Sequence, residues 1–200
     1  SVSADLRSML YVWDAALAKE GAKIIYQRQK YIEALLPYVK EIFSGLSGGR
    51  ENIEIKIAGE FDYKDINQKE AEEKLLKILN ENQNSDILNH ITKAGPHRDD
   101  IEILINGKSA RLYGSQGQQR SCVLTLKLAE VSLLRDKTDT EPVALLDDVM
   151  SELDENRQDY ILNHIKDWQV FITCCDAQSI LRLKKGKTIK IENGAAVTEE

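Results

Sequence analysis

Hydrophobic residues in the first fifth of the chain recur at intervals of three and four, which is the pattern of an amphipathic helix. The pattern runs from residue 4 to about residue 43 and comprises Leu6, Met9, Leu10, Trp13, Leu17, Ile24, Tyr31, Leu35, Val39 and Ile42. Gly21 and Pro37 interrupt it, so it predicts either one long helix or two helices that meet near one of these residues. We expect Gly48-Gly49 to end this region.

Beyond residue 49 the spacing of apolar residues changes between strand and helix patterns. Ile53, Ile55 and Ile57 alternate with polar residues and predict a strand with one buried face. Asn106-Gly107 lies between two short apolar runs and predicts a β-hairpin. The other expected elements are helices over residues 67–80, 118–134, 155–166 and 177–183, and strands over residues 101–105, 109–113, 143–146, 169–173 and 188–192.

This order of elements predicts an α/β protein in which a helical arm precedes a mixed sheet region. The composition becomes polar between Gly59 and Gly95, and the boundary is expected there. We therefore predict a helical arm subdomain with one or more strands over residues 1–90, and a second α/β part over residues 91–200.

Two adjacent carboxylates, Asp147 and Asp148, follow the apolar run at residues 143–146. The run is rich in Val and Leu and predicts a strand that is buried on both faces. Open α/β sheets bind their ligands at the carboxyl ends of the strands. One carboxylate there can hold Mg²⁺, and its neighbour can orient or deprotonate an attacking water. The simpler interpretation is that both residues cap the turn that follows.

Residues 113–120 have the sequence YGSQGQQR, a polar turn with glycines that precedes a predicted helix. Ser115 suits the N-cap position, and Gly117 lets backbone N–H groups approach an anion. The helix dipole favours an anion at the same end. The pattern therefore indicates either a phosphate contact or an ordinary helix start.

Two charged segments offer further candidates. In the GPHRDD segment at residues 95–100, His97 and Arg98 can contact a phosphate while Asp99 or Asp100 orients them, or the segment is a solvated loop. A basic run near the C-terminus can follow a DNA backbone or form a solvated edge. The run comprises Arg182, Lys184, Lys185, Lys187 and Lys190.

The totals for the chain restrict its partners and its compartment. A net charge of -6 argues against general attraction to nucleic acid, so any DNA contact has to come from a local basic patch. No apolar run approaches the roughly 20 residues of a membrane span. The three cysteines, Cys122, Cys174 and Cys175, lack metal-ligand spacing with a histidine and indicate a reducing cytoplasm. The chain starts without Met inside a helical pattern, and we expect it to be part of a longer protein.

Three segments together resemble the RecF family of bacterial recombination mediators. They are GPHRDD at residues 95–100, YGSQGQQR at residues 113–120 and LLDDVMSELD at residues 145–154. The helical region around Trp13-Asp14 and residues 21–25 and the closing strand are similar to that family too. The resemblance implies that this α/β chain is the C-terminal lobe of an ABC-type P-loop NTPase head, with signature and Walker B sequences, plus a helical arm.

The resemblance also implies roles for individual residues. Asp147 corresponds to the Walker B aspartate that holds Mg²⁺ through water, and Asp148 to the catalytic carboxylate that polarises the attacking water. Ser151 and Asp154 belong to a loop that contacts the opposite subunit of a dimer. The signature sequence, which contacts the γ-phosphate of ATP on the other subunit, corresponds to Ser115, Gln116, Gly117, Gln118 and Gln119.

The function that the resemblance implies is that of a cytoplasmic protein of DNA replication, repair, recombination and the SOS response. Such a protein binds DNA at junctions of single strand and duplex, dimerises on binding ATP, and helps to load RecA together with RecO and RecR. Its ATPase activity is weak and stimulated by DNA.

Two departures from the wider cassette class and one missing motif limit this expectation. Asp148 stands where that class usually has Glu, so hydrolysis should be slow. Cys174 and Cys175 follow the strand at residues 169–173, where the class has a histidine that senses the γ-phosphate. The chain has no G-x-x-x-x-G-K-[ST] loop, so ATP and Mg²⁺ need the missing N-terminal half, and the chain alone should not turn over ATP.

Two other interpretations stay open at this point. The chain can be a metal-dependent phosphoesterase or nuclease that uses Asp147 and Asp148, with His97 and with Asp99 or Asp100. It can also be a non-catalytic docking module whose arm binds a partner.

Overall fold

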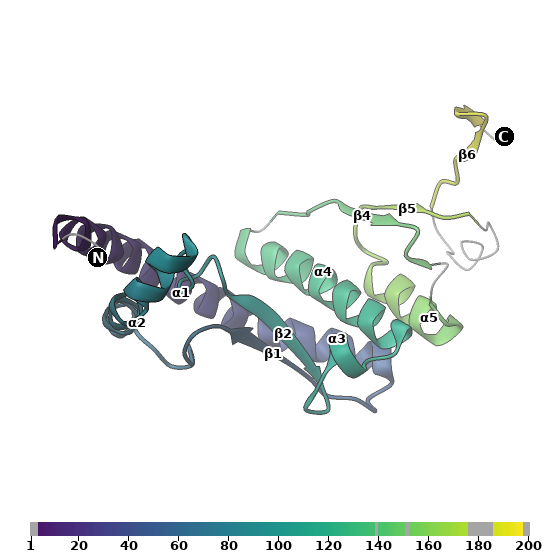
Figure 1. Cartoon of the computed structure of the whole chain (residues 1–200). Coiled ribbons are helices and arrows are strands. Elements are labelled where there is room, and N and C mark those ends of the chain that lie inside the picture. The colour runs from purple at the N-terminus through teal and green to yellow at the C-terminus, as the bar shows by residue number, and fades with distance from the viewer. Residues whose placement is uncertain (1–3, 139, 151–152, 176–185, 198–200) are drawn as a thin grey trace. The chain divides into compact units, whose positions relative to one another are not determined.

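A computed structural model describes residues 4–138, 140–150, 153–175 and 186–197 (Figure 1). The chain divides into two compact units, residues 1–137 and residues 138–200. The predicted boundary near residue 90, between a helical arm subdomain and a second α/β part, stays a prediction. None of the described helices is both long and apolar enough to cross a membrane.

Residues Ala4–Ser47 form a single helix of 44 residues, α1. It continues through both Gly21 and Pro37, so one long helix is confirmed and the alternative of two helices is wrong. Pro37 lacks the N–H that a helix interior uses and usually bends or breaks a helix. Leu35 and Val39 on either side of it are buried, so packing holds the helix together across this position.

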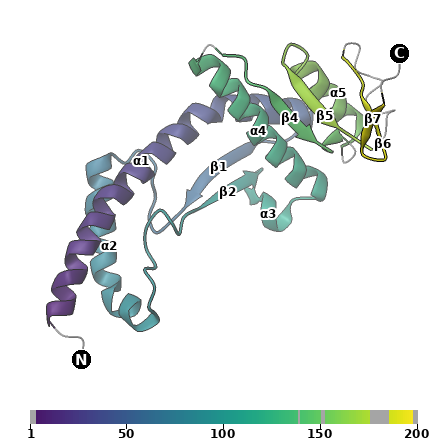
Figure 2. The ribbon, with the colours of Figure 1, turned by 90° about the horizontal axis from the view of Figure 1, so that it is seen from above.

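Helix α2 (Gln68–Asn89) packs against α1, as both ribbon views show (Figures 1 and 2). Asn67 and Glu70 start it with a capping box, in which each side chain accepts the backbone N–H of the other. The helix runs past its predicted end at residue 80. The added turns lack an apolar period, and a 2.8 Å hydrogen bond from Gln83 to Asp14 ties them to α1.

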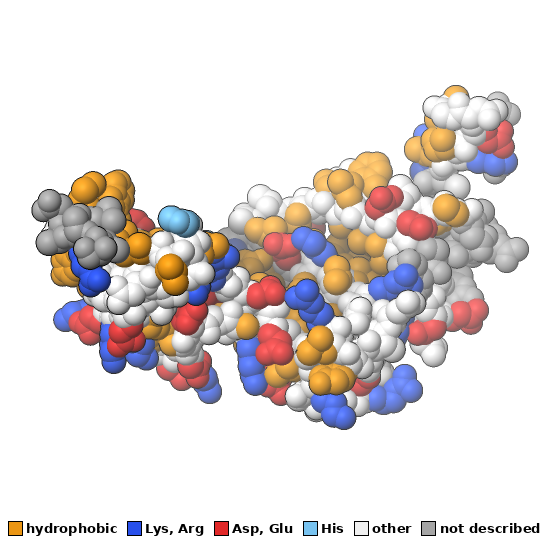
Figure 3. All heavy atoms as spheres, viewed as in Figure 1, with side chains coloured by type: hydrophobic (Ala, Val, Ile, Leu, Met, Phe, Trp, Pro, Cys, Tyr) orange, Lys and Arg blue, Asp and Glu red, His pale blue; other side chains and the backbone are white. Residues whose placement is uncertain are grey.

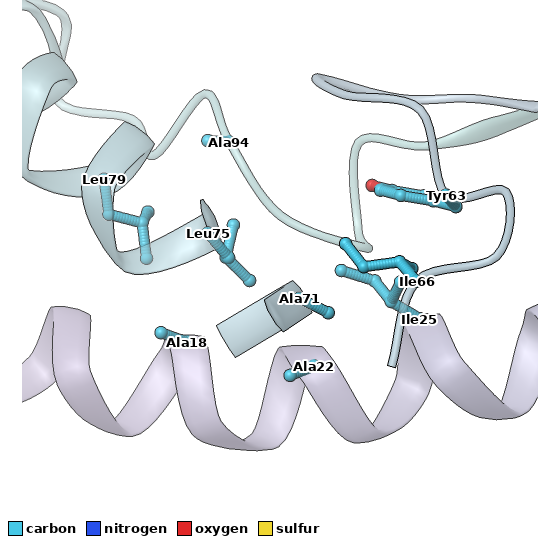
Figure 4. Close-up of a cluster of buried hydrophobic side chains, with 9 residues drawn as sticks. All are labelled: Ala18, Ala22, Ile25, Tyr63, Ile66, Ala71, Leu75, Leu79 and Ala94. Carbon is cyan, nitrogen blue, oxygen red and sulfur yellow. The ribbon is translucent and has the colours of Figure 1, made fainter. Parts of the chain in front are cut away.

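Small and branched side chains of α1 and α2 build a core together with Tyr63, Ile66 and Ala94 from outside the two helices (Figure 4). Gly21 permits their close approach, because a Cβ there would lie 2.8 Å from Cδ2 of Leu75 and 3.2 Å from Cδ of Pro96. Gly21, expected as a possible helix break, is therefore a packing position. The buried cluster comprises Ala18, Ala22, Ile25, Tyr63, Ile66, Ala71, Leu75, Leu79 and Ala94.

An antiparallel sheet of three strands follows, in the order β1 (Ile53–Ala58), β2 (Asp100–Ile105) and β3 (Lys108–Ser109). Asn106 and Gly107 form the predicted two-residue turn, with φ values of 50° and 76°. The strand predicted over residues 109–113 is wrong beyond its first residue, since the chain turns into a helix there.

That helix is α3 (Ala110–Tyr113), closed by a 3.0 Å hydrogen bond from the Gly114 N–H to the Ala110 carbonyl. Helix α4 (Gln116–Thr138) comes next and is longer at both ends than the predicted helix over residues 118–134. Two side-chain hydrogen bonds join α4 to α1, from Tyr31 to Glu130 and from Tyr38 to Asp136.

In the second unit β4 (Ala144–Asp147) and β5 (Val170–Thr173) run parallel and are connected through α5 (Glu155–His164). The prediction that this first strand is buried on both faces is wrong. Ala144 and Leu146 are buried, whereas Leu145 between them is exposed. One face of the pair is therefore open in the described part of the unit.

A short hairpin closes the described chain, formed by β6 (Lys190–Glu192) and β7 (Ala195–Val197) around Asn193-Gly194. The first of these strands falls within the predicted strand at residues 188–192. The second was not predicted, although Asn-Gly marks this turn as it marks the earlier one. The helix predicted over residues 177–183 lies outside the described residues.

Candidate functional site

The carboxyl ends of β4 and β5 bring Asp147 and Thr173 side by side. The two residues are register partners, and the Thr173 hydroxyl donates a hydrogen bond to Oδ1 of Asp147. The backbone N–H of Asp148 lies 3.0 Å from the Thr173 Oγ1 and 3.2 Å from its carbonyl oxygen. Both aspartates are exposed, so the carboxylate pair predicted from the sequence lies at the strand ends where such sheets bind ligands.

The sheet face that carries Asp147 and Thr173 is apolar further back along the strands. Leu145 and Phe171, each two residues before them, are register partners and are 75% and 58% exposed. Parallel sheets usually have both faces covered. This pair of strands is therefore unusual in having a bare apolar face next to its carboxylates.

The loop between β4 and α5 is held by Gln158, which the sequence did not single out. Its buried Nε2 donates to the carbonyls of Met150 at 2.7 Å and Leu153 at 3.1 Å. The only sequence signal was a polar residue on the buried side of a helix. Asp154 is the N-cap of α5, and its place in a dimer contact stays a prediction. Ser151, predicted for the same contact, lies outside the described residues.

Ser115 begins α4 with a capping box. Its Oγ accepts the Gln118 N–H at 3.2 Å, and the Gln118 Oε1 accepts the Ser115 N–H at 2.7 Å. Gln118 also donates to Glu51 at 2.6 Å, and Gln119 donates to the carbonyl of Gly114 at 3.1 Å. Two of the three glutamines of the predicted signature, Gln118 and Gln119, therefore hold the start of the helix in place.

Three donor groups at this helix start are not used by the helix itself and suit an anion. The hydroxyl hydrogen of Ser115 stays available while its oxygen accepts a bond. The N–H groups of Gln116 and Gly117 lie in the first helical turn, which has no intrahelical acceptors. Gly114 lets the chain turn tightly into the helix, since a Cβ there would lie 2.4 Å from the Ala110 carbonyl oxygen. Whether a phosphate binds here stays a prediction.

An exposed surface next to this helix start was missed by the sequence reasoning. Leu112 and Tyr113 of α3 are 72% and 74% exposed, and the exposed Arg111 before them pairs with Asp100 at 3.5 Å. Figure 3 shows hydrophobic and basic side chains together over α3. The only signal was the run Arg-Leu-Tyr, which was assigned to a strand.

Asp99 of the GPHRDD segment is a buried structural residue. Its side chain is 2% exposed, accepts a 2.7 Å hydrogen bond from the Tyr63 hydroxyl and pairs with Arg28 at 3.5 Å. Burial raises the pKa of Asp99, and the Tyr63 and Arg28 contacts oppose that rise. Since its carboxylate is occupied, Asp99 does not support the alternative of a nuclease that uses it as a metal ligand.

His97 and Arg98 in the same segment are exposed and turn back toward one backbone oxygen. The His97 ring lies 3.3 Å from the Thr92 carbonyl, and Nε of Arg98 donates to it at 3.1 Å. Among the other candidate DNA contacts, Lys184 and Lys185 lie outside the described residues, and Lys187 is exposed. Contacts of these residues with phosphate or DNA stay predictions.

The cysteines differ in their environments. Cys122 is buried, and burial raises the pKa of its thiol to about 11. Cys174 is partly buried and Cys175 is exposed. The structure does not assign either of the last two the role of the missing histidine.

Comparison with known proteins identifies the relatives of this chain, although no family model matches it. The DNA replication and repair protein RecF of Clostridium tetani is 40% identical over 195 residues, which are 96% of this chain and 53% of that protein. The RecF protein of Lachnospira eligens is 39% identical over 201 aligned residues, 100% of this chain and 53% of the relative. The chain is a homologue of RecF. It spans about half the length of the curated relatives it matches.

Solved structures of RecF confirm the relationship at the level of the fold. The chain matches the recombination mediator protein RecF-ATP in the RecFOR pathway with a TM-score of 0.80 and 35% identity, over 96% of this chain and 51% of that one. For RecF-ATPrS the TM-score is 0.78 and the identity 36%, over 94% of this chain and 50% of that one. The predicted resemblance to RecF and the mixed α/β class are therefore confirmed, and the residue roles stay predictions.

Proposed function

We propose that the chain is one half of a RecF-type recombination mediator, and that it acts in the complete protein as part of an ATP-dependent, DNA-binding dimer. The observation that carries the proposal is the exposed pair Asp147-Asp148 at the end of a parallel strand. It occurs in a chain that is 40% identical to a RecF protein over 96% of its length.

The groups at the end of β4 fit Mg²⁺. Magnesium usually takes one or two carboxylates from a protein and completes its shell with water and substrate phosphates. Within the described ranges no group of three or more His, Cys, Asp or Glu side chains gathers to hold a metal alone. When bound, Mg²⁺ would neutralise the negative charge that develops in phosphoryl transfer.

The chain's own residues then have separate tasks. Asp147 holds the metal through water, and Asp148 polarises the attacking water. Because Asp148 is one methylene shorter than the usual Glu, we expect slow turnover. The Ser115 hydroxyl and the first-turn N–H groups of α4 bind the γ-phosphate across a dimer.

The bare apolar face of β4 and β5 supports the proposal that this chain is half of a head. Leu145 and Phe171 expose large apolar side chains on a parallel pair, a position that is normally covered. The chain also lacks the lysine-bearing phosphate loop. We propose that the other half of the protein covers this face and provides that loop.

Similarity to RecF supports a corresponding proposal for the partners. DNA at junctions of single strand and duplex is the proposed ligand, and RecO and RecR are the proposed partners in helping to load RecA. The candidate DNA contacts are His97, Arg98, Lys184, Lys185 and Lys187.

Calorimetric titration of the chain with Mg-ATP, alone and mixed with the other half of the protein, tests the proposal. We expect no binding to the chain alone, binding to the mixture, and slow hydrolysis by the mixture that Asp148→Asn abolishes. Saturable tight binding of Mg-ATP by the chain alone would overturn the proposal that the nucleotide site needs both halves of the protein.

Two further outcomes of the same series would replace the proposal. Metal-dependent cleavage of DNA by the chain, lost in Asp148→Asn, would favour the phosphoesterase. The docking module would be favoured if Asp148→Asn changed nothing while substitutions on the helical arm abolished partner binding.

A further inference from the structure

Thr173 makes two hydrogen bonds that have only one consistent arrangement. A hydroxyl has one hydrogen to donate, and its oxygen can accept. The carboxylate of Asp147 can only accept and the amide of Asp148 can only donate. The Thr173 hydroxyl therefore donates to Asp147 Oδ1 and accepts the Asp148 N–H at 3.0 Å.

These two bonds determine different properties of the carboxylate pair. The first fixes the direction of the Asp147 carboxylate while leaving its second oxygen for a cation or its water. The second, together with the 3.2 Å bond of the same N–H to the Thr173 carbonyl, holds the backbone of Asp148, which has a φ of 50°. Residues other than glycine adopt this left-handed conformation infrequently, and it needs support from the surrounding structure. That turn of the backbone sets where the Asp148 side chain leaves the strand end.

We propose that Thr173 is a positioning residue, one that orients Asp147 toward Mg²⁺ and Asp148 toward the attacking water. This inference rests on the proposed ATPase function and deepens it. Thr173 is itself exposed and lies next to the site, on the neighbouring strand rather than in the aspartate motif. Its hydroxyl donates a hydrogen bond to Asp147, its register partner on β4.

The structure offers a variant that removes the hydroxyl with little effect on the strand. Valine has nearly the shape of threonine and the same β-branching, so Thr173→Val keeps the strand preference. Thr173→Ser keeps the hydroxyl. Thr188→Val is the matched control, since Thr188 is an exposed threonine outside the described strands.

The first readout is metal binding, measured on the assembled protein in which this chain is combined with the other half. Binding of Mn²⁺, as a paramagnetic substitute for Mg²⁺, is followed by electron paramagnetic resonance with a non-hydrolysable ATP analogue. Loss of an outer-shell partner typically weakens metal binding or activity about 10-fold or more, which is the effect expected for Thr173→Val. Thr173→Ser and Thr188→Val should stay within about twofold of the wild type, well below that effect.

The second readout is hydrolysis, together with nucleotide binding in EDTA. Thr173→Val should lower kcat about 10-fold and leave metal-free nucleotide binding and the thermal midpoint unchanged. Wild-type Mn²⁺ affinity and kcat in Thr173→Val would overturn the inference, as would an equal loss in Thr173→Ser. Absence of hydrolysis in the wild-type assembly would overturn the proposed ATPase, and the Mn²⁺ measurement would still decide the role of Thr173.

Discussion

Removal of one hydroxyl, in Tyr63→Phe, tests how the GPHRDD segment stabilises the first unit. The Tyr63 hydroxyl donates at 2.7 Å to Asp99, whose side chain is buried, and the Tyr63 ring packs edge-on against Phe61 at 4.6 Å between centroids. Phenylalanine keeps the ring contact and removes only the donor. Hydrogen bonds to charged groups contribute about 1.5–3 kcal/mol, so we expect the free energy of unfolding to fall by about 2 kcal/mol.

The effect of this substitution should depend on pH in a defined direction. Burial raises the pKa of Asp99 above its ordinary value of 3.8, and the Tyr63 hydrogen bond lowers it. Without that bond the folded-state pKa rises further. The loss in Tyr63→Phe is therefore complete at a pH above the folded-state pKa of Asp99 in the variant, and it shrinks as the pH falls from that value to the folded-state pKa of Asp99 in the wild type. Below that range a neutral hydrogen bond of about 1 kcal/mol remains to be lost.

Urea denaturation of the chain, followed by circular dichroism at neutral and acidic pH, measures both effects. Tyr31→Phe is the matched control, because its hydroxyl donates to Glu130 at 3.1 Å on an exposed surface. That control should stay within about 0.5 kcal/mol of the wild type. A Tyr63→Phe variant as stable as the control, or a loss that grows as the pH falls, would refute the reasoning.

Two substitutions and the chemistry of the cysteines test other features of the chain. Gly114→Ala should destabilise the protein by about 1–3 kcal/mol in urea, because the new Cβ meets the Ala110 carbonyl oxygen, and unchanged stability would contradict the tight turn. Asn67→Ala should cost about 1 kcal/mol through loss of the cap of α2, and a neutral result would show that the capping box is dispensable. A thiol reagent at pH 8 should modify the exposed Cys175 quickly and the buried Cys122 at least about 100-fold more slowly, since burial raises the pKa of the Cys122 thiol to about 11. Equal rates of modification would show that Cys122 is not buried. The raised thiol pKa also predicts that stability from Cys122 is complete below about pH 9 and is lost as the pH rises toward 11.

The helices of the first unit show what sequence periodicity can and cannot predict. The period of three and four residues identified α1 but left Gly21 ambiguous, because its role depends on Leu75 and Pro96, which come from distant segments. The end of α2 was placed too early, since residues beyond 80 have no apolar period and are held by contacts such as Gln83 to Asp14. Local patterns do not contain such tertiary contacts.

The sequence predicted the site residues that follow one another on β4 but not their partner on β5. Asp147 and Asp148 stood out because two acids end an apolar run. Thr173 gave no signal, because one threonine at the end of a strand is ordinary and its partner lies 26 residues away. The open face of β4 was also missed, since Leu145 looks like any core residue until its exposure is measured.

The length of α1 has a mechanical consequence. A straight helix of 44 residues is about 66 Å long at 1.5 Å per residue. It contacts α2 near one end and α4 nearer the other. A rotation of about 5° at the α4 end would displace the opposite end by about 6 Å, the rise of roughly one helical turn. At this length, a small adjustment of side chains at one end of α1 would move the other end far enough to make or break a contact there.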